Sequence, residues 1–331
     1  MTPEDFKEYL EQNHECFKIW GQYVTDSIVT KLTENLGYDP INSFIKIHPI
    51  PRVKEIKSAL SKIGRKNYTN PIKQMTDLVG VRFVVLLSEH ISTISNIICS
   101  EPTWVAVTSK DYADEISENP KLFDYQSLHF EVRPKIDIDV SNILINTDIC
   151  CEVQIRTLLQ HAYAELVHDN IYKPIGVVPA KAERQVAKSM ALMETTDELF
   201  CSTMRLLSDA NKTRNNLYLD LTNIYRDKIG EQYIDSDEKI NFLVLDTFKA
   251  LFEKNLSASI NSLLDAKKYI AIKISQRASS SLIFSQPCVL FIYWAVITHG
   301  ADLVNNLWPL PGYWRELNII FSDLDLKPTN A

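Results

Sequence analysis

The chain has 331 residues, of which 45% are hydrophobic and 23% charged, and it carries a net charge of −7. These values are typical of a soluble globular protein with one large or two modest domains, and the negative charge argues against a general nucleic-acid binder. Six cysteines form no C-x-x-C pair, which argues against a zinc ribbon and favours reduced thiols in a cytoplasm. We expect neither export nor membrane insertion, because the N-terminus lacks a signal-like segment and the most apolar stretch, 287–298, is too short to span a bilayer.

The first half of the chain predicts an α+β domain. Apolar residues at helical spacing predict a lead-in helix over residues 1–36, ended by Gly37 and Pro40. Further helices are expected from Val53 to Ile63 and over 72–75, 89–99 and 158–172. Strands are expected over 79–87, 103–108, 127–132 and 150–156, with 142–147 as part of a hairpin and 109–124 as a polar loop. Because strands and helices intermix without a strict βαβ period, we expect a mixed sheet.

The second half of the chain predicts helices only. After a linker over 174–179, helical patterns cover 180–209, 214–230, 238–256, 259–279 and 287–307. The chain thus divides into two expected domains, 1–176 and 177–331. No motif in the second domain assigns it a role, and its most apolar run, 289–294, is predicted as a core helix.

Positive charge is concentrated in one segment of this acidic chain. Between Lys46 and Lys73, eight basic residues accompany a single acid, Glu55, so the segment carries a charge of +7. A local basic patch indicates a polyanion site, and a solvated helix face is the alternative interpretation.

A second candidate feature lies on the strand expected over 150–156. Val153 and Ile155 point to one side, so Glu152, Gln154 and Arg156 share the other. A buried face keeps such a trio only with partners, because unpaired polar groups are costly there. An exposed face keeps it at little cost, so the trio alone leaves a site and a plain surface equally open.

With these segments in view, the chain resembles a RelA/SpoT-type alarmone synthetase domain, either a stand-alone small synthetase or a toxic relative. The resemblance rests on short motifs that occur in the family's order across residues 45–175. They are Arg52-x-Lys54, Lys57-Ser58-x-Leu60-x-Lys62, Asp77-Leu78-Val79-Gly80-Val81-Arg82, Lys110-Asp111-Tyr112, Pro120-Lys121, Tyr125-Gln126-Ser127-Leu128-His129 and Glu152-Val153-Gln154-Ile155-Arg156-Thr157. The resemblance implies a nucleotidyltransferase-like mixed sheet flanked by helices, here followed by an all-helical region.

The resemblance also implies an activity: transfer of the β,γ-diphosphate of ATP to the 3′-hydroxyl of GTP or GDP, with Mg²⁺ as cofactor. Asp77 and Glu152 would be the catalytic carboxylates and metal ligands, Asp77 as the ligand and Glu152 as a second ligand or the base. The implied ATP contacts are Arg52, Lys54, Lys62 and Arg82. The implied acceptor contacts are Lys110, Lys121, Tyr125, His129, Gln154 and Arg156, with Tyr125 stacked on the base.

Alternatives stay open at this point. The family usually has Gly before the stacking Tyr, whereas this chain has Asp124, so a toxic relative that modifies the 3′ end of tRNA is the second hypothesis. A catalytically silent binding or sensor module is the third. A homo-oligomer and a protein regulator acting through residues 177–331 are further expected partners. His161, Glu165 and His168 have the spacing of metal ligands on one helix, but helix packing explains them better.

Overall fold

The computed structural model describes residues 2–37, 39–119, 121–123, 127–167, 171 and 177–327. The chain forms two compact units, Met1–Met204 and Arg205–Ala331. One long helix, α9 (Ala180–Lys228), contributes its first half to the first unit and its second half to the other. The boundary between the units therefore falls inside a helix, and the division by role into 1–176 and 177–331 stays a prediction.

The first unit is built on a six-stranded sheet in the order β1-β3-β8-β5-β4, and β2 pairs with β3 beside this path. The strands are β1 (Ile45–Ile47), β2 (Arg52–Val53), β3 (Val79–Val85), β4 (Trp104–Lys110), β5 (Leu128–Pro134) and β8 (Cys151–Thr157). β3 and β8 run parallel, and all the other pairs in this sheet are antiparallel. The predicted mixed sheet is confirmed.

The hairpin predicted near residues 142–147 is also present. β6 (Ile138–Val140) and β7 (Ile143–Ile145) form a separate two-stranded sheet. The two residues between them, Ser141 and Asn142, have φ values of 54° and 63°. Two successive left-handed residues are typical of the two-residue turn that matches the natural twist of a hairpin.

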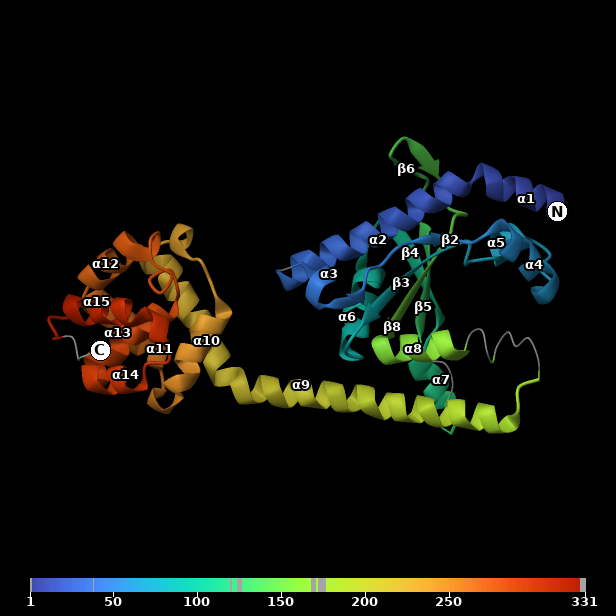
Figure 1. Ribbon diagram of the computed structural model, residues 1–331. Coiled ribbons are helices and arrows are strands. Elements are labelled where there is room, and N and C mark those ends of the chain that lie inside the picture. The colour runs from blue at the N-terminus through green and yellow to red at the C-terminus, as the bar shows by residue number, and fades with distance from the viewer. Residues whose placement is uncertain are drawn as a thin grey trace. The chain divides into compact units, whose positions relative to one another are not determined.

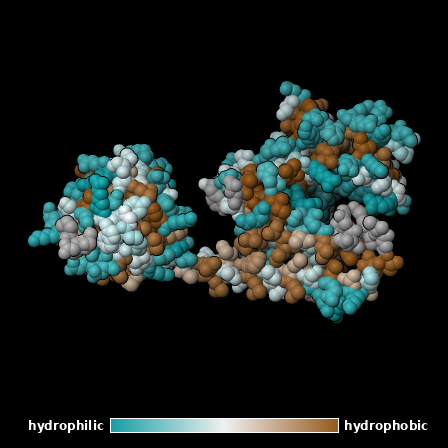
Figure 2. Space-filling model, viewed as in Figure 1, coloured by the Kyte–Doolittle hydropathy of each residue, from teal (hydrophilic) through white to brown (hydrophobic). Residues whose placement is uncertain are grey.

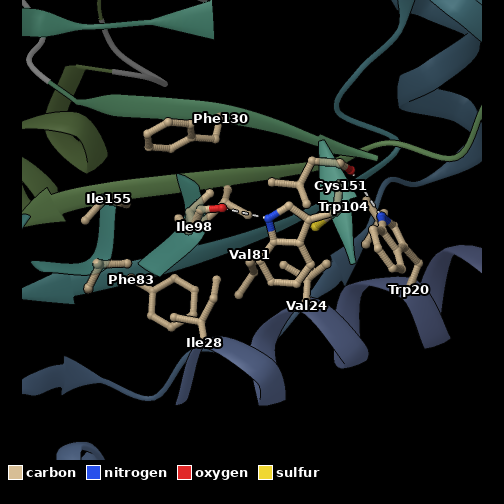
Figure 3. Close-up of a cluster of buried hydrophobic side chains, with 14 of the residues drawn as sticks. Trp20, Val24, Ile28, Val81, Phe83, Ile98, Trp104, Phe130, Cys151 and Ile155 are labelled. Carbon is tan, nitrogen blue, oxygen red and sulfur yellow. Dashed lines mark hydrogen bonds between the residues drawn. The ribbon is translucent and has the colours of Figure 1, made fainter. Parts of the chain in front are cut away.

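One face of the six-stranded sheet is apolar and carries the core of this unit. Helices α2 (His14–Leu36) and α6 (Glu89–Ser100) pack on it (Figure 1). Figure 3 shows Val24 and Ile28 of α2 beside Val81 and Phe83 of β3. The buried indoles are satisfied, since Trp20 Nε1 donates to the Val132 carbonyl at 3.2 Å and Trp104 Nε1 donates to the Ile98 carbonyl at 2.8 Å.

Gly21 lets α2 approach the sheet closely. A Cβ atom at this position would lie 2.7 Å from Val79 Cγ2 and 2.9 Å from Pro51 Cβ. The absence of a side chain therefore places the helix directly on the amino end of β3, next to the segment that carries the catalytic candidates.

The remaining helices of the first unit are α1 (Pro3–Gln12), α3 (Pro40–Ser43), α4 (Ile56–Lys66), α5 (Pro71–Gln74), α7 (Tyr112–Glu118) and α8 (Leu158–Val167). The lead-in is thus two helices, and α2 ends at Gly37, whose φ of 71° is left-handed. α8 contacts β3 and β8, and the rest of the helix predicted to residue 172 lies largely outside the described residues.

Two predicted segments of the first unit are wrong. Arg52 and Val53 do not begin a helix but form β2, because they pair with Gly80 and Val79. Residues 112–118 are not a loop but the helix α7, which begins where the Asp111 side chain accepts a hydrogen bond from the Ala113 amide at 2.9 Å. Such a cap stabilises a helix too short to show an apolar period.

The second unit is all-helical, as predicted, with different boundaries. The elements after α9 are η2 (Glu231–Tyr233), α10 (Glu238–Thr247), η3 (Lys249–Leu251), α11 (Leu256–Ala266), α12 (Tyr269–Ala278), α13 (Cys288–His299), α14 (Ala301–Leu307), η4 (Pro311–Tyr313) and α15 (Trp314–Asp323). The predicted break near residue 210 is wrong, because no Gly or Pro interrupts α9 there. The last helix, α15, was not predicted.

Helix α13 is the core of the second unit. Its residues from Cys288 to Val296 are all buried, as predicted for the most apolar run of the chain. No helix in the described part of the chain is long and apolar enough to cross a membrane.

Apolar side chains also line an exposed part of α9, where brown spheres follow the helix in Figure 2. The exposed apolar residues of α9 in the first unit include Leu192, Leu199 and Phe200.

Candidate active site

The polar face of the sheet gathers half of the candidate residues into two rows. In the first row, Arg52 of β2 lies opposite Gly80 of β3, Gly80 opposite Glu152 of β8, and Glu152 opposite Glu131 of β5. In the second row, the sheet pairing brings together four candidates from four strands. They are Arg82 of β3, Gln154 of β8, His129 of β5 and Lys110 of β4.

Gly80 leaves space at the centre of the first row. A Cβ atom there would lie 3.2 Å from the Glu152 carbonyl oxygen and 3.9 Å from Glu152 Cβ. A side chain on Gly80 would therefore press on the strand that carries Glu152.

Asp77 and two candidate ATP-binding lysines form one cluster at the start of β3. Lys54 Nζ lies 2.6 Å and Lys62 Nζ 2.8 Å from the same oxygen, Asp77 Oδ2. Burial opposes the charged carboxylate, but the hydrogen bonds from Lys54 and Lys62 outweigh it and hold the pKa of Asp77 below its usual value. Asp77 Oδ1 is buried and has no hydrogen-bond partner.

Glu152 is held ionised by its neighbours on the second row. His129 Nδ1 lies 3.4 Å from Glu152 Oε1, and Gln154 Nε2 donates to Glu152 Oε2 at 2.8 Å. Burial would raise the pKa of Glu152, yet the bonds from His129 and Gln154 hold it below its usual value, against a smaller opposing effect of the Asp77 charge. Arg156 Nη2 in turn donates to Gln154 Oε1, so the trio predicted to share one face is linked by hydrogen bonds.

Arg82 is the candidate that faces α8. Its Nη1 lies 3.1 Å from Glu165 Oε1, and His161 Nδ1 lies 3.8 Å from the same oxygen. Burial, then the positive charges of Arg156 and Arg82, lower the pKa of His161, so its imidazole is neutral at neutral pH. His168, the third member of the predicted spacing, lies outside the described residues.

The candidate acceptor segment lies at the other edge of the sheet. Lys110 Nζ forms an ion pair of 3.3 Å with Glu115 Oε2 of α7, so an acidic side chain neutralises one of the candidate acceptor-binding residues. Lys121 is exposed, and Tyr125 lies outside the described residues, as does Asp124.

Two residues around the site, Glu131 and Asp197, were not found from the sequence. Glu131 lies opposite Glu152 and its Oε2 is 3.7 Å from Arg133 Nη2. Strand alternation from His129 could have placed Glu131 on the polar face. The 2.6 Å hydrogen bond between Thr157, the last residue of the Glu152–Thr157 motif, and Asp197 had no sequence signal, because it depends on how α9 packs.

One carboxylate, that of Asp77, has an oxygen that suits a hard divalent cation such as Mg²⁺. Asp77 has one buried oxygen without a partner, which is what a carboxylate ligand would offer to a metal. Among the residues that the structure describes, no group of three or more His, Cys, Asp or Glu side chains forms a complete metal site. A magnesium ion held by one or two carboxylates and by nucleotide phosphates needs no such complete set.

Comparisons with known proteins address the first unit. A family model described as "Region found in RelA / SpoT proteins" matches residues 51–176. Over these residues the chain is similar to that family. The matched segment contains every candidate site residue, from Arg52 to Arg156, and it ends before α9 begins.

Two curated relatives are similar to about half of the chain. The chain is 26% identical over 148 residues to GTP pyrophosphokinase YjbM of Bacillus subtilis, which covers 44% of this chain and 66% of that relative. It is 26% identical over 166 residues to GTP pyrophosphokinase YwaC of the same organism, covering 49% of this chain and 73% of the relative.

A solved structure shares the fold. The GTP pyrophosphokinase family protein from Streptococcus pneumoniae superposes with a TM-score of 0.50 and 22% identity, over 63% of this chain and 97% of that one. At this identity the likeness concerns the fold alone. It is consistent with the predicted α+β class of the first unit.

Proposed function

We propose that this chain is a diphosphotransferase that moves the β,γ-diphosphate of ATP to the 3′-hydroxyl of GTP or GDP and so makes (p)ppGpp. The observation that carries the proposal is the pair of rows on the polar face of the sheet. They bring together Arg52, Arg82, Lys110, His129, Gln154 and Glu152 from five strands, and the charge of Asp77, from the segment before β3, acts on Glu152. The GTP pyrophosphokinase names of the two curated relatives agree with this chemistry.

The cations on the β2–β3 side would bind the triphosphate of ATP. Lys54 and Lys62 are half-buried and converge on one point, whereas Lys57 and Lys66 are exposed on α4. Converging ammonium groups stabilise the negative charge of a polyphosphate, and guanidinium groups such as that of Arg82 bind it with two hydrogen bonds. ATP phosphates would then share the two lysines with Asp77.

Glu152 would accept the proton of the attacking 3′-hydroxyl. Its lowered pKa keeps it ionised at neutral pH, and the bonds from His129 and Gln154 fix its orientation. The 3′-oxygen forms a bond to the β-phosphorus of ATP, the bond from that phosphorus to the bridging α–β oxygen breaks, and AMP leaves. The acceptor would lie towards Lys110, Lys121 and Tyr125.

Mg²⁺ is the cofactor that this proposal includes. Asp77 would hold it through the oxygen that has no hydrogen-bond partner, and Glu152 is the second candidate ligand. When bound, the ion would stabilise the charge that develops on the transferred phosphates.

The decisive experiment gives the full chain γ-labelled ATP and Mg²⁺ with GDP, GTP or deacylated tRNA as acceptor. We expect label on the guanine nucleotides together with release of AMP, and no transfer by the Glu152→Gln variant. Label on tRNA alone would show that the acceptor is the 3′ end of tRNA and not a guanine nucleotide. Absence of transfer to every acceptor would reject the enzymatic proposal and favour a binding module.

A further inference from the structure

Asp197 is a buried carboxylate far along the chain from every candidate site residue. It lies in the first half of α9, and only 5% of its surface is exposed. Its Oδ2 accepts a hydrogen bond from the Thr157 hydroxyl at 2.6 Å, and its Oδ1 is buried without a partner. Burial raises the pKa of Asp197 to about 6. Burying a carboxyl group with one unpartnered oxygen costs folding free energy, so we infer that its hydrogen bond with Thr157 has a structural role.

Thr157 is the junction between β8 and α8. Its Oγ1 accepts from the Gln160 amide at 3.1 Å, while its own amide donates to Gln160 Oε1 at 2.9 Å. This reciprocal pair is a capping box, which fixes where the strand ends and the helix starts. The hydroxyl that donates to Asp197 is the same one that caps α8, so Asp197 orients the cap.

The same part of α9 contacts the end of one other strand. Cys201 Sγ lies 3.2 Å from Ser88 Oγ, which follows β3. β3 and β8 run parallel, so α9 contacts the sheet along the edge where both strands end.

We propose that Asp197 is a positioning residue of the candidate active site. It fixes Thr157, and thereby the carboxyl end of β8, whose preceding polar residues are joined in series: Arg156 to Gln154, and Gln154 to Glu152. A shift of the strand end would be passed along this series to the carboxylate. The role in catalysis rests on the proposed diphosphate transfer, whereas the role in fixing the strand end does not.

The test compares variants of the full chain. Asp197→Ala and Thr157→Val each remove one partner of the bond, and Thr157→Ser restores the hydroxyl. Glu198→Ala is the matched control, since Glu198 is the adjacent acid on α9 and is exposed. We expect Asp197→Ala and Thr157→Val to lower kcat on the order of 10- to 100-fold, the scale of a small misplacement of a reacting group. We expect KM for ATP to change by less than about threefold, because the candidate ATP lysines come from other segments. Thr157→Ser should retain activity.

Amide hydrogen exchange provides a readout that does not depend on the reaction. We expect faster exchange at Thr157 and Gln160 in Asp197→Ala and in Thr157→Val, with α1 and the β6–β7 hairpin unchanged. Unchanged exchange at Thr157 and Gln160 in both variants would overturn the proposal, as would faster exchange with wild-type kcat. If the wild-type chain transfers diphosphate to no acceptor, the proposed function fails, while the exchange data still decide whether Asp197 fixes the strand end.

Discussion

Lys54 Nζ lies 2.6 Å from Asp77 Oδ2, so a candidate ATP-binding cation and a candidate metal ligand neutralise each other in this structure. Lys62 shares the same oxygen at 2.8 Å. ATP binding and metal binding, which the sequence analysis assigned to different residues, would therefore both depend on the cluster of Lys54, Lys62 and Asp77. Any substitution in the cluster changes the electrostatics of the other two members, which determines how the variants below are to be interpreted.

Replacement of Glu152 by Gln tests the proposed base. The amide keeps the shape of the side chain but cannot accept the proton, so kcat should fall by roughly 10²-fold or more while ATP affinity is retained. Glu131→Gln is the matched control, since Glu131 lies directly opposite on β5 and pairs with Arg133. Diphosphate transfer at a near wild-type rate by Glu152→Gln would refute its assignment as the base.

Removal of the basic side chains tests the proposed ATP site. Arg52→Ala and Lys54→Ala should each weaken ATP binding by about 1.5–3 kcal/mol, the range for a lost charge-assisted hydrogen bond. Lys57→Ala should leave the affinity unchanged, because Lys57 belongs neither to the rows on the sheet nor to the two lysines that contact Asp77. Isothermal titration calorimetry measures all three. Equal affinities in all variants would indicate that the basic segment is only a solvated surface.

The pKa of Asp197 predicts an unusual dependence of stability on pH. Its folded-state pKa of about 6 lies above the unfolded value, so the folded protein favours the protonated acid. Asp197 therefore contributes its full share to the free energy of unfolding below its unfolded pKa of about 4. This contribution, about 3 kcal/mol, is lost as pH rises through about 6. The phenol of Tyr112 stays neutral throughout this range, because burial raises its pKa.

Urea unfolding of the wild type and of Asp197→Asn between pH 4.5 and 7.5 measures this effect, with Glu198→Gln as the control. Relative to the Asn variant, the wild type should lose stability as pH rises across this window. Asp77 and Glu152 act in the opposite sense, because their pKa values are lowered, and their contribution is lost only as pH falls below about 4. Parallel curves for wild type and variant would show that Asp197 ionises normally.

The second unit has its own buried carboxylate, Asp323. Its replacement tests whether the second unit unfolds independently of the first. Asp323 accepts hydrogen bonds from Arg277, from Lys273 at 2.9 Å and from the Tyr293 hydroxyl at 2.6 Å. Asp323→Ala leaves these groups without their partner and should destabilise the helical unit by about 3–5 kcal/mol. Calorimetry should show one transition lowered and the other unchanged. Asp302→Ala, an exposed acid on α14, should change neither.

Truncation tests whether the helical unit restrains the enzyme. The first compact unit ends at Met204, so a shortened chain of residues 1–204 keeps Asp197 and the packing of Met190 on Tyr163 and Val167. We expect it to fold and to transfer diphosphate at least as fast as the full chain. A shorter truncation, residues 1–176, lacks these contacts and should be far less soluble. A marked loss of activity in a folded 1–204 would argue that the helical unit assists catalysis.

The sequence by itself determined the α+β class of the first unit and which side chains of β8 share the polar face. Period-two alternation placed Glu152, Gln154 and Arg156 on one face, because side chains in a strand must alternate whatever the strand pairs with. The apolar run of α13 likewise had to be buried, since its nine successive apolar residues, 288–296, leave no polar face for solvent. Motifs in order then indicated which polar residues belong together.

Only the tertiary structure decided the register and the connections between distant segments. Arg82, Gln154, His129 and Lys110 form one row because β3 pairs parallel with β8, and β8 antiparallel with β5, which no local pattern specifies. Asp197 likewise meets Thr157, 40 residues earlier in the chain, only because α9 docks beside the end of β8. Alternation and helical period are properties of neighbouring residues, whereas the partner of a buried polar atom depends on how segments far apart in the chain pack together.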